Sequence, residues 1–152
     1  MLSYQVEQFS YELVDELKVL LEAHWEEIAM YKDKIAFAPD YTVYGRLATV
    51  DGLHIVTVRD DGKLIGYYIS FLYYHPHYKH DKFAINDIMF IDKEHRGGTA
   101  GYRLLKFAES ELKSIGVSVM MLHMKTEFPF EGLCQAIGMD RQEIVYSKYL
   151  GE

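Results

Sequence analysis

A glycine-rich turn is the clearest chemical feature of the sequence. It runs from His95 to Gly101 as HRGGTAG, between a predicted strand, 83–91, and a predicted helix. Glycines leave backbone N–H groups open to a ligand, and the start of a helix adds roughly half a positive charge. Arg96 adds a cation that can pair bidentately with a phosphate, and Thr99 can donate its hydroxyl or cap the helix. These residues predict a phosphate site, with a tight strand–helix turn that binds nothing as the alternative.

The charge of the chain limits which ligands it can bind. The net charge is -7, from 16 lysines and arginines against 23 acidic residues. Nucleic-acid binding draws most of its affinity from basic side chains on phosphates, so we expect no nucleic-acid partner. A polyanionic small molecule would be repelled except where positive charge is concentrated locally. Lys93, His95 and Arg96 provide such a concentration at the turn.

The composition is that of one folded domain. Of the 152 residues, 49% are hydrophobic, which is enough for a core. The length is too short for two domains of ordinary size. We therefore expect a single domain over residues 1–152. No apolar run reaches the ~20 residues of a membrane-spanning helix, which predicts no membrane partner. The single cysteine cannot form an internal disulfide, so a reducing, cytoplasmic setting is expected.

Hydrophobic periodicity predicts the elements that must position the turn. A stripe with helical spacing, from Leu13 to Ile28, predicts a helix that Ser10 caps. Asp60 to Lys63 reads DDGK, a strong hairpin turn between strands over 54–59 and 64–73. The remaining expected elements are a first strand near Tyr4 and Val6, a loop or broken helix over 37–51, a helix from the turn to Gly116, a strand over 117–124, a short helix from about Pro129 to Ile137 and a last strand over 143–150.

The order of these elements predicts a mixed α/β (α+β) domain. Strand 83–91, the helix after the turn and strand 117–124 form a βαβ crossover, so the two strands should be parallel neighbours. Side chains alternate along a strand. One face of strand 83–91 should therefore carry Phe83, Ile85, Asp87, Met89 and Ile91.

The stretch from Ile91 to Leu105 resembles motif A of the GNAT superfamily of acyl-CoA-dependent N-acetyltransferases. That motif is a strand, an acidic turn and then Arg/Gln-x-x-Gly-x-Gly/Ala at the start of a helix. The residues that match in place are Arg96, Gly97, Gly101, Leu104 and Leu105. Thr99 stands where the family usually has its middle glycine, and Gly98 comes one position early. Ala136 to Met139 further resembles the end of motif B.

The resemblance implies the GNAT fold over the whole chain, a mostly antiparallel central sheet, and acetyl-CoA as co-substrate. The pantetheine would lie along the backbone of Met89, Phe90 and Ile91. The diphosphate would rest on the amides of Arg96, Gly97, Gly98, Thr99, Ala100 and Gly101. Two tracts, His24 to Ala29 and His75 to Tyr78, are similar to a GNAT branch often encoded by phages or prophages.

Deprotonation of the acceptor amine is the most demanding step, since an amine of pKa ~10.4 costs about 4.6 kcal/mol to deprotonate at pH 7. Asp87 is the first candidate base, because apolar neighbours would raise its pKa and family members often carry a carboxylate there. A structural carboxylate is the alternative. Glu27 is the second candidate, because the family's first helices wall the acceptor site. Residues 7–27 hold seven acids, which could attract a cationic acceptor or simply face solvent.

The group that protonates the departing thiolate is less defined. Cys134 lies four residues before Gly138, where the family commonly has a tyrosine, although a cysteine is more often a small buried hydrophobe. Tyr146, on the predicted last strand, could reach the sulfur instead. The thiolate lies only about 2 kcal/mol from its protonated form at pH 7, so solvent could also supply the proton.

Three histidines, His75, His77 and His80, could suggest zinc, but they lie on a loop rather than in a rigid frame. We expect no metal and an acceptor-site loop. The sequence thus predicts an N-acetyltransferase that transfers an acetyl group from acetyl-CoA directly to a primary amine of a small molecule or protein. The alternative is a GNAT-fold CoA-binding or protein-interaction module with weak or no catalysis. A homodimer is left open.

Overall fold

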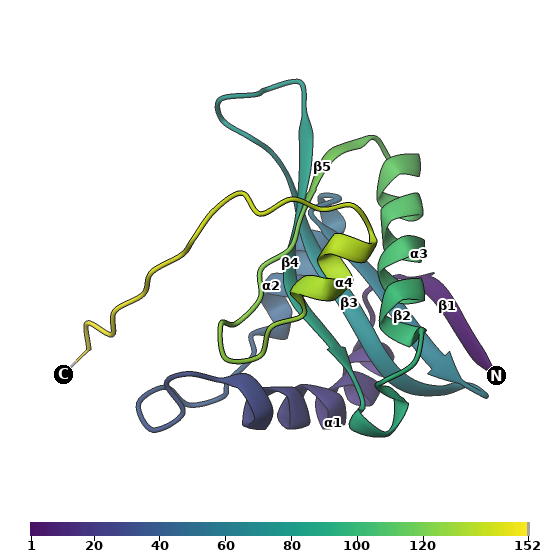
Figure 1. Cartoon of the computed structure of the whole chain (residues 1–152). Helices are drawn as coiled ribbons and strands as arrows, with labels where there is room; N and C mark the ends of the chain where they lie inside the picture. The colour runs from purple at the N-terminus through teal and green to yellow at the C-terminus, as the bar shows by residue number, and fades with distance from the viewer. Residues whose placement is uncertain (152) are drawn as a thin grey trace.

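Five strands form one sheet, in chain order, in the computed structural model, which describes residues 1–151 (Figure 1). The strands are β1 (Leu2–Glu7), β2 (Leu53–Asp60), β3 (Lys63–Tyr74), β4 (Lys82–Ile91) and β5 (Val117–Met121). The pairings from β1 to β4 are antiparallel, and β4 pairs with β5 in parallel. The predicted mixed, mostly antiparallel sheet with a parallel βαβ unit is confirmed.

Helices cover both faces of this sheet. They are α1 (Tyr11–Ile28), α2 (Tyr41–Thr49), the 3-10 turn η1 (Lys93–His95), α3 (Ala100–Ser114) and α4 (Glu131–Ala136). On one face, α1 packs Leu13 and Leu17 into a core with Tyr67 and Phe90. On the other face, α3 buries its predicted apolar stripe, Leu104, Leu105, Ala108 and Leu112. Among the helices of residues 1–151, none has an apolar stretch long enough to span a bilayer.

The predicted hairpin between β2 and β3 is confirmed in detail. Asp61 and Gly62 have positive φ angles of 46° and 87°. Two consecutive residues with positive φ form the tight turn whose twist matches that of the flanking strands. A glycine at the second position accepts this conformation without steric cost.

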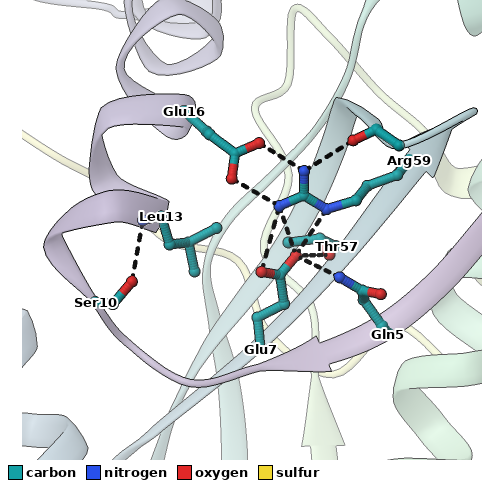
Figure 2. Close-up of polar contacts among 8 residues, drawn as sticks. Gln5, Glu7, Ser10, Leu13, Glu16, Thr57 and Arg59 are labelled. Carbon is teal, nitrogen blue, oxygen red and sulfur yellow. Dashed lines mark hydrogen bonds and ion pairs between the residues drawn. The ribbon is translucent and has the colours of Figure 1, made fainter.

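A cluster around Arg59 of β2 fastens the start of α1 to the sheet (Figure 2). The guanidinium donates to both oxygens of Glu7 in β1 and of Glu16 in α1, at donor–acceptor distances from 2.6 to 3.3 Å. It also donates to the carbonyl of Gly62 at 3.1 Å. Thr57 donates its hydroxyl to the same Glu7 carboxylate at 2.5 Å. The cluster therefore joins β1, β2 and α1.

The register of β3 and β4 contains a bulge at Asp87. Ile69 lies opposite Ile88, whereas the next residue of β3, Ser70, lies opposite Asn86. Asp87 is thus an extra residue of β4 without a partner in β3. Such a bulge bends the strand and changes the direction of the side chains around it.

The bulge overturns one prediction about the faces of β4. Met89 and Ile91 pack with the core on the α3 side, whereas Ile88 and Phe90 pack with the core on the α1 side. Asp87 contacts the hydroxyl of Tyr44 in α2 and lies near Tyr67, which belongs to the core on the α1 side, so the prediction that Asp87 shares its face with Met89 and Ile91 is wrong. The physical reason is the extra residue, which shifts the alternation by one position.

Region 37–51, predicted as a loop or broken helix, contains the regular helix α2. The carboxylate of Asp40 caps it by accepting from the amides of Thr42 and Val43, at 2.9 and 3.3 Å. A cap of this kind satisfies amides that otherwise lack a partner at a helix start. The helix is therefore supported locally even though its sequence contains Gly45.

The predicted last strand, 143–150, is wrong, because this segment has no strand structure. The edge strand β5 ends at Met121, and the segment forms no β-ladder with it. Instead it runs away from the sheet and reaches the loop after α1 (Figure 1). There the hydroxyls of Tyr31 and Ser147 lie 3.1 Å apart, and the Tyr31 ring lies 6.0 Å from that of Tyr149.

Candidate active site

An open strand edge lies where β4 and β5 separate. The two strands pair only from Lys82 to Ile85 on β4. Just beyond, the Asn86 side chain donates to the backbone carbonyl of His123 at 3.1 Å and accepts from its amide at 2.5 Å. On this side, residues 87–91 pair with no strand in the part of the chain that the structure describes. An extended ligand could therefore hydrogen-bond to this backbone as an added strand would.

The glycine turn lies at the end of this open edge. Gly97 has a φ of 85°, and a Cβ built at Gly97 or Gly98 would meet no atom within 4 Å. Thr99 is the N-cap residue of α3, but its side chain makes no capping hydrogen bond. Among the residues that the structure describes, no side chain hydrogen-bonds to the first amides of this 15-residue helix. Open space beside such amides suits an anionic ligand.

Gly101 has a different role from the other glycines of the turn. A Cβ there would lie 3.3 Å from Cδ2 of Leu133 and 3.7 Å from Cδ1 of Ile91. The missing side chain allows α4 to pack closely on the start of α3. Gly101 is therefore explained by packing as well as by the predicted ligand contact.

Arg96 was predicted to pair with a phosphate, but its side chain is bound within the protein. Its Nη1 and Nη2 atoms bind the two Glu27 oxygens at 2.7 and 3.0 Å, and its Nε donates to the Ile91 carbonyl at 2.7 Å. The guanidinium also lies 4.9 Å from the centre of the Phe90 ring. Much of its positive charge is therefore balanced within the protein.

Glu27 of α1 is the partner of Arg96 in this ion pair. The Nζ atom of Lys93 lies 3.8 Å from Oε2 of the same carboxylate. The hydrogen bonds from Arg96 lower the pKa of the Glu27 carboxylate. A carboxylate held in its ionised form by an arginine is a weak proton acceptor. This geometry gives Glu27 a role in joining α1 to the turn rather than the arrangement of a base.

Asp87 lies in a contrasting environment. Its carboxylate accepts a 2.5 Å hydrogen bond from the hydroxyl of Tyr44 in α2. Burial raises the pKa of Asp87, and the hydrogen bond from Tyr44 offsets part of that rise. A half-buried carboxylate with a raised pKa, beside an open strand edge, has the properties that general bases need.

Two residues that the sequence patterns did not predict, His24 and Tyr67, lie behind this carboxylate. His24 of α1 is buried, stacks on Phe90 at 4.9 Å, and places its Nδ1 2.8 Å from the hydroxyl of Tyr67. Burial lowers the pKa of His24 to about 4, so the ring is neutral at pH 7. His24 lies three residues after Leu21 in the apolar stripe of α1, and this spacing was the available signal.

The two predicted proton donors to the thiolate, Cys134 and Tyr146, do not lie together at this site. Cys134 is buried in α4, on the α3 side of the sheet, and burial raises the pKa of its thiol. Tyr146 is 91% exposed in the C-terminal segment, since the strand that was to carry it is absent. The structure gives neither side chain a contact with Asp87.

The acidic excess of α1 is mostly used within the protein. Of the seven acids from Glu7 to Glu27, five pair with lysine or arginine in the structure: Glu7, Asp15, Glu16, Glu26 and Glu27. This pairing weakens the expectation that α1 attracts a cationic acceptor by charge. Within residues 1–151, no group of three histidines, cysteines or acids is placed to hold a metal ion. His75 and Tyr78 pack on each other and on Phe83, and His77 packs on His75 and Tyr78.

Comparisons with known proteins bear on the fold and the family of the chain. No curated protein matches the sequence. An aminoglycoside acetyltransferase from an uncultured soil metagenomic sample, solved with sisomicin, is 12% identical over 99% of this chain and 97% of its own, with a TM-score of 0.78. Glucosamine-6-phosphate N-acetyltransferase from Arabidopsis thaliana is 14% identical over 98% and 99%, with a TM-score of 0.72. These likenesses show a shared fold.

A third solved structure, the ribosomal-protein-alanine N-acetyltransferase of Brucella melitensis, is 17% identical over 99% of this chain and 100% of its own, with a TM-score of 0.72. The sequence itself is matched by the family model of the acetyltransferase (GNAT) family over residues 11–129. That match covers well over half of the chain, and it includes the open edge of β4 and the glycine turn. The chain therefore belongs to the GNAT family of acetyltransferases.

Proposed function

We propose that this chain is an N-acetyltransferase that transfers an acetyl group from acetyl-CoA directly to a primary amine of a small molecule or protein. The GNAT family uses acetyl-CoA, whose thioester supplies the activated acyl group. The observation that carries the proposal is the position of Asp87, a half-buried carboxylate at the first residue of β4 beyond the bridge from Asn86 to His123. A proton acceptor therefore lies beside the edge available to the acyl donor.

The residues of the turn and of the open edge fit acetyl-CoA. The backbone of Met89, Phe90 and Ile91 would hold the pantetheine, as the resemblance to motif A implies. The diphosphate would lie on the amides from Gly97 to Gly101, where the space beside Gly97 and Gly98 is open. Because Arg96 is bound to Glu27, we assign the diphosphate contacts to the backbone rather than to the arginine side chain.

Asp87 is the proposed general base. It would take a proton from the nitrogen of the acceptor as the C–N bond forms, and the C–S bond of the thioester breaks. Its raised pKa brings it closer to the pKa of an amine, which makes the proton transfer less unfavourable. Glu27 is not proposed for this step because its ion pair with Arg96 lowers its pKa.

Transfer is proposed to be direct, without a covalent enzyme intermediate. Cys134 is the only cysteine, and its buried thiol has a raised pKa, so little thiolate forms to act as a nucleophile. The departing thiolate would take its proton from solvent. That step is favourable by about 2 kcal/mol at pH 7 for a thiol with a pKa near 8.5.

The direct experiment incubates the purified chain with acetyl-CoA and a panel of amines and detects products by mass spectrometry. The panel contains sisomicin, glucosamine-6-phosphate, a peptide with an N-terminal alanine and a simple diamine. Thermal melting with and without acetyl-CoA reports binding independently of turnover. Acetylated product from at least one amine is expected, together with a higher melting temperature. Stabilisation by acetyl-CoA without any product would favour the binding-module alternative.

Asp87→Asn tests the assigned base. The variant should lower kcat by roughly 100-fold or more, the range of a general base, while the stabilisation by acetyl-CoA stays. The matched control is Asp81→Asn, the same chemical change at an exposed residue just before β4. Equal turnover in Asp87→Asn and the wild type would remove Asp87 from this role.

A further inference from the structure

Tyr44 makes a specific contact with Asp87 that the sequence did not suggest. Its hydroxyl donates to Oδ2 of Asp87 at 2.5 Å, from a helix 43 residues away in the sequence. Its ring packs 6.1 Å from the ring of Phe71, which fixes the direction of the hydroxyl. Among residues 1–151, no other side chain or backbone group hydrogen-bonds to the Asp87 carboxylate. The orientation of this carboxylate therefore depends on one partner.

The position of Tyr44 is built into the packing of α2. A Cβ at the next residue, Gly45, would lie only 3.2 Å from Cε1 of Phe9, so the missing side chain allows close approach. Asp40 caps the same helix one turn earlier. The helix is thus fixed on both sides of Tyr44, by the Asp40 cap and by the contact of Gly45 with Phe9. Tyr44 therefore reaches Asp87 from a regular helix and not from a loop.

The other ionisable groups around Asp87 are few and uncharged at neutral pH. Tyr67 of β3 faces it, with His24 of α1 behind that hydroxyl. Tyr41 of α2 lies close to Tyr44. In the described part of the chain, no lysine or arginine forms an ion pair with Asp87. Burial and the Tyr44 hydroxyl are therefore the two opposing influences on the charge of this carboxylate.

We propose that Tyr44 is a positioning residue for Asp87: it holds the carboxylate in one orientation and stabilises its deprotonated form, ready to accept the amine proton. This inference rests on the proposed function, in which Asp87 is the base. Nothing in the sequence pattern or in the family comparison assigns such a role to Tyr44.

Tyr44 is suited to donate a hydrogen bond to Asp87 and not to give up its own proton. Burial and the adjacent Asp87 raise the pKa of its hydroxyl well above the ordinary value for tyrosine. The hydroxyl therefore stays protonated at any pH at which the protein works, and it always has a hydrogen to donate. Without it, burial alone would act on Asp87 and raise the pKa of that carboxyl further.

The test is a direct titration of Asp87 in the ligand-free protein. Aspartate carboxyl carbons are labelled with 13C, the Asp87 signal is assigned by its absence in Asp87→Asn, and its chemical shift is followed by NMR as the pH is varied. In Tyr44→Phe, which keeps the ring and loses the hydroxyl, the midpoint should rise by about one pH unit or more. The control Tyr41→Phe, on the same helix, should leave it unchanged.

A second variant avoids removing the contact. A fluorinated tyrosine placed at position 44 has a more acidic hydroxyl and is a stronger donor, so the midpoint of Asp87 should fall below that of the wild type. Opposite shifts in the two variants would be difficult to produce by a general loosening of the fold. Equal midpoints in the wild type and in both variants would overturn the proposal.

The kinetic arm separates this inference from the proposed function. With the amine found to be acetylated, the acid limb of kcat/KM against pH should move upward in Tyr44→Phe, so that the loss of activity grows as the pH falls and becomes small at alkaline pH. An acid limb that stays in place, with Asp87→Asn inactive, would overturn the role of Tyr44 alone. Full activity of Asp87→Asn would overturn the proposed base, and the positioning role with it.

Discussion

Two arginines tie α1 to the rest of the protein, one near each end, and they differ in how fully the fold uses them. Arg59 binds two carboxylates and a backbone carbonyl, and its side chain is only 12% exposed. Arg96 binds one carboxylate, Glu27, and one carbonyl, and its side chain is 36% exposed beside the glycine turn. The first cluster is partly buried between β1, β2 and α1, and the second lies at the proposed ligand site.

The difference indicates what each ion pair can do. The Arg59 guanidinium is held between two carboxylates and is only 12% exposed, so its charge contributes to stability and is not available to a ligand. Arg96 is partly open to solvent, where a single ion pair contributes little to stability. Its partner Glu27 can nevertheless change the electrostatic potential at the turn. We therefore propose a structural role for Arg59 and a ligand-linked role for Arg96.

The largest expected effect is on stability, at the buried end of this comparison. Arg59→Met should lower the free energy of unfolding by about 3 kcal/mol, because it leaves the half-buried Glu7 carboxylate without its cation. The melting temperature should fall by roughly 6–12 °C in thermal denaturation followed by circular dichroism. The control Lys63→Met removes an exposed cation beside the same turn and should have little effect. A similar fall in both variants would mean that the cluster around Arg59 is not the anchor of α1.

A smaller and different effect is expected at the other end of α1. Glu27→Gln should change stability by about 1 kcal/mol or less, since its arginine partner is partly exposed. It should also tighten acetyl-CoA binding by roughly three- to tenfold, because the charge of Arg96 is no longer balanced. Calorimetry at two salt concentrations measures this, with the gain expected to shrink at high salt.

The neighbouring Glu26→Gln is the control for that prediction, because Glu26 pairs with Lys32 rather than with Arg96. Weaker acetyl-CoA binding in Glu27→Gln would contradict the prediction and show that the ion pair shapes the turn for its ligand. Loss of turnover with unchanged affinity would instead support Glu27 as the base in place of Asp87.

The sequence could predict the parts of this molecule that depend on local patterns. The hairpin at Asp61 and Gly62 and the glycine turn before α3 are set by residues next to one another in the chain. The βαβ unit follows from the order of its elements, because the crossover connection is nearly always of one kind. The motif A likeness added the family, which the match over residues 11–129 confirmed.

The remaining features depend on contacts between distant segments. The bulge at Asp87 exists only in the register of β4 against β3, and no alternation within β4 reveals it. The partner of Arg96 is 69 residues away in the sequence, and the partner of Asp87 is 43 residues away. Tyr44 was overlooked because its helix was predicted only as a loop or broken helix. Asp40, just after Pro39, was the available capping signal.

The smallest expected effect isolates the turn from the ion pairs altogether. Gly98 has open space where a Cβ would lie and does not need a positive φ, so Gly98→Ala should leave the melting temperature nearly unchanged. If the diphosphate lies on the amides of the turn, the new methyl group would occupy that space and weaken acetyl-CoA binding by roughly two- to fivefold. Gly132→Ala adds a methyl group in open space on α4 and is the control. Equal affinity in both variants would place the diphosphate away from Gly98, and the charge of Arg96 would then be the more important feature of the turn.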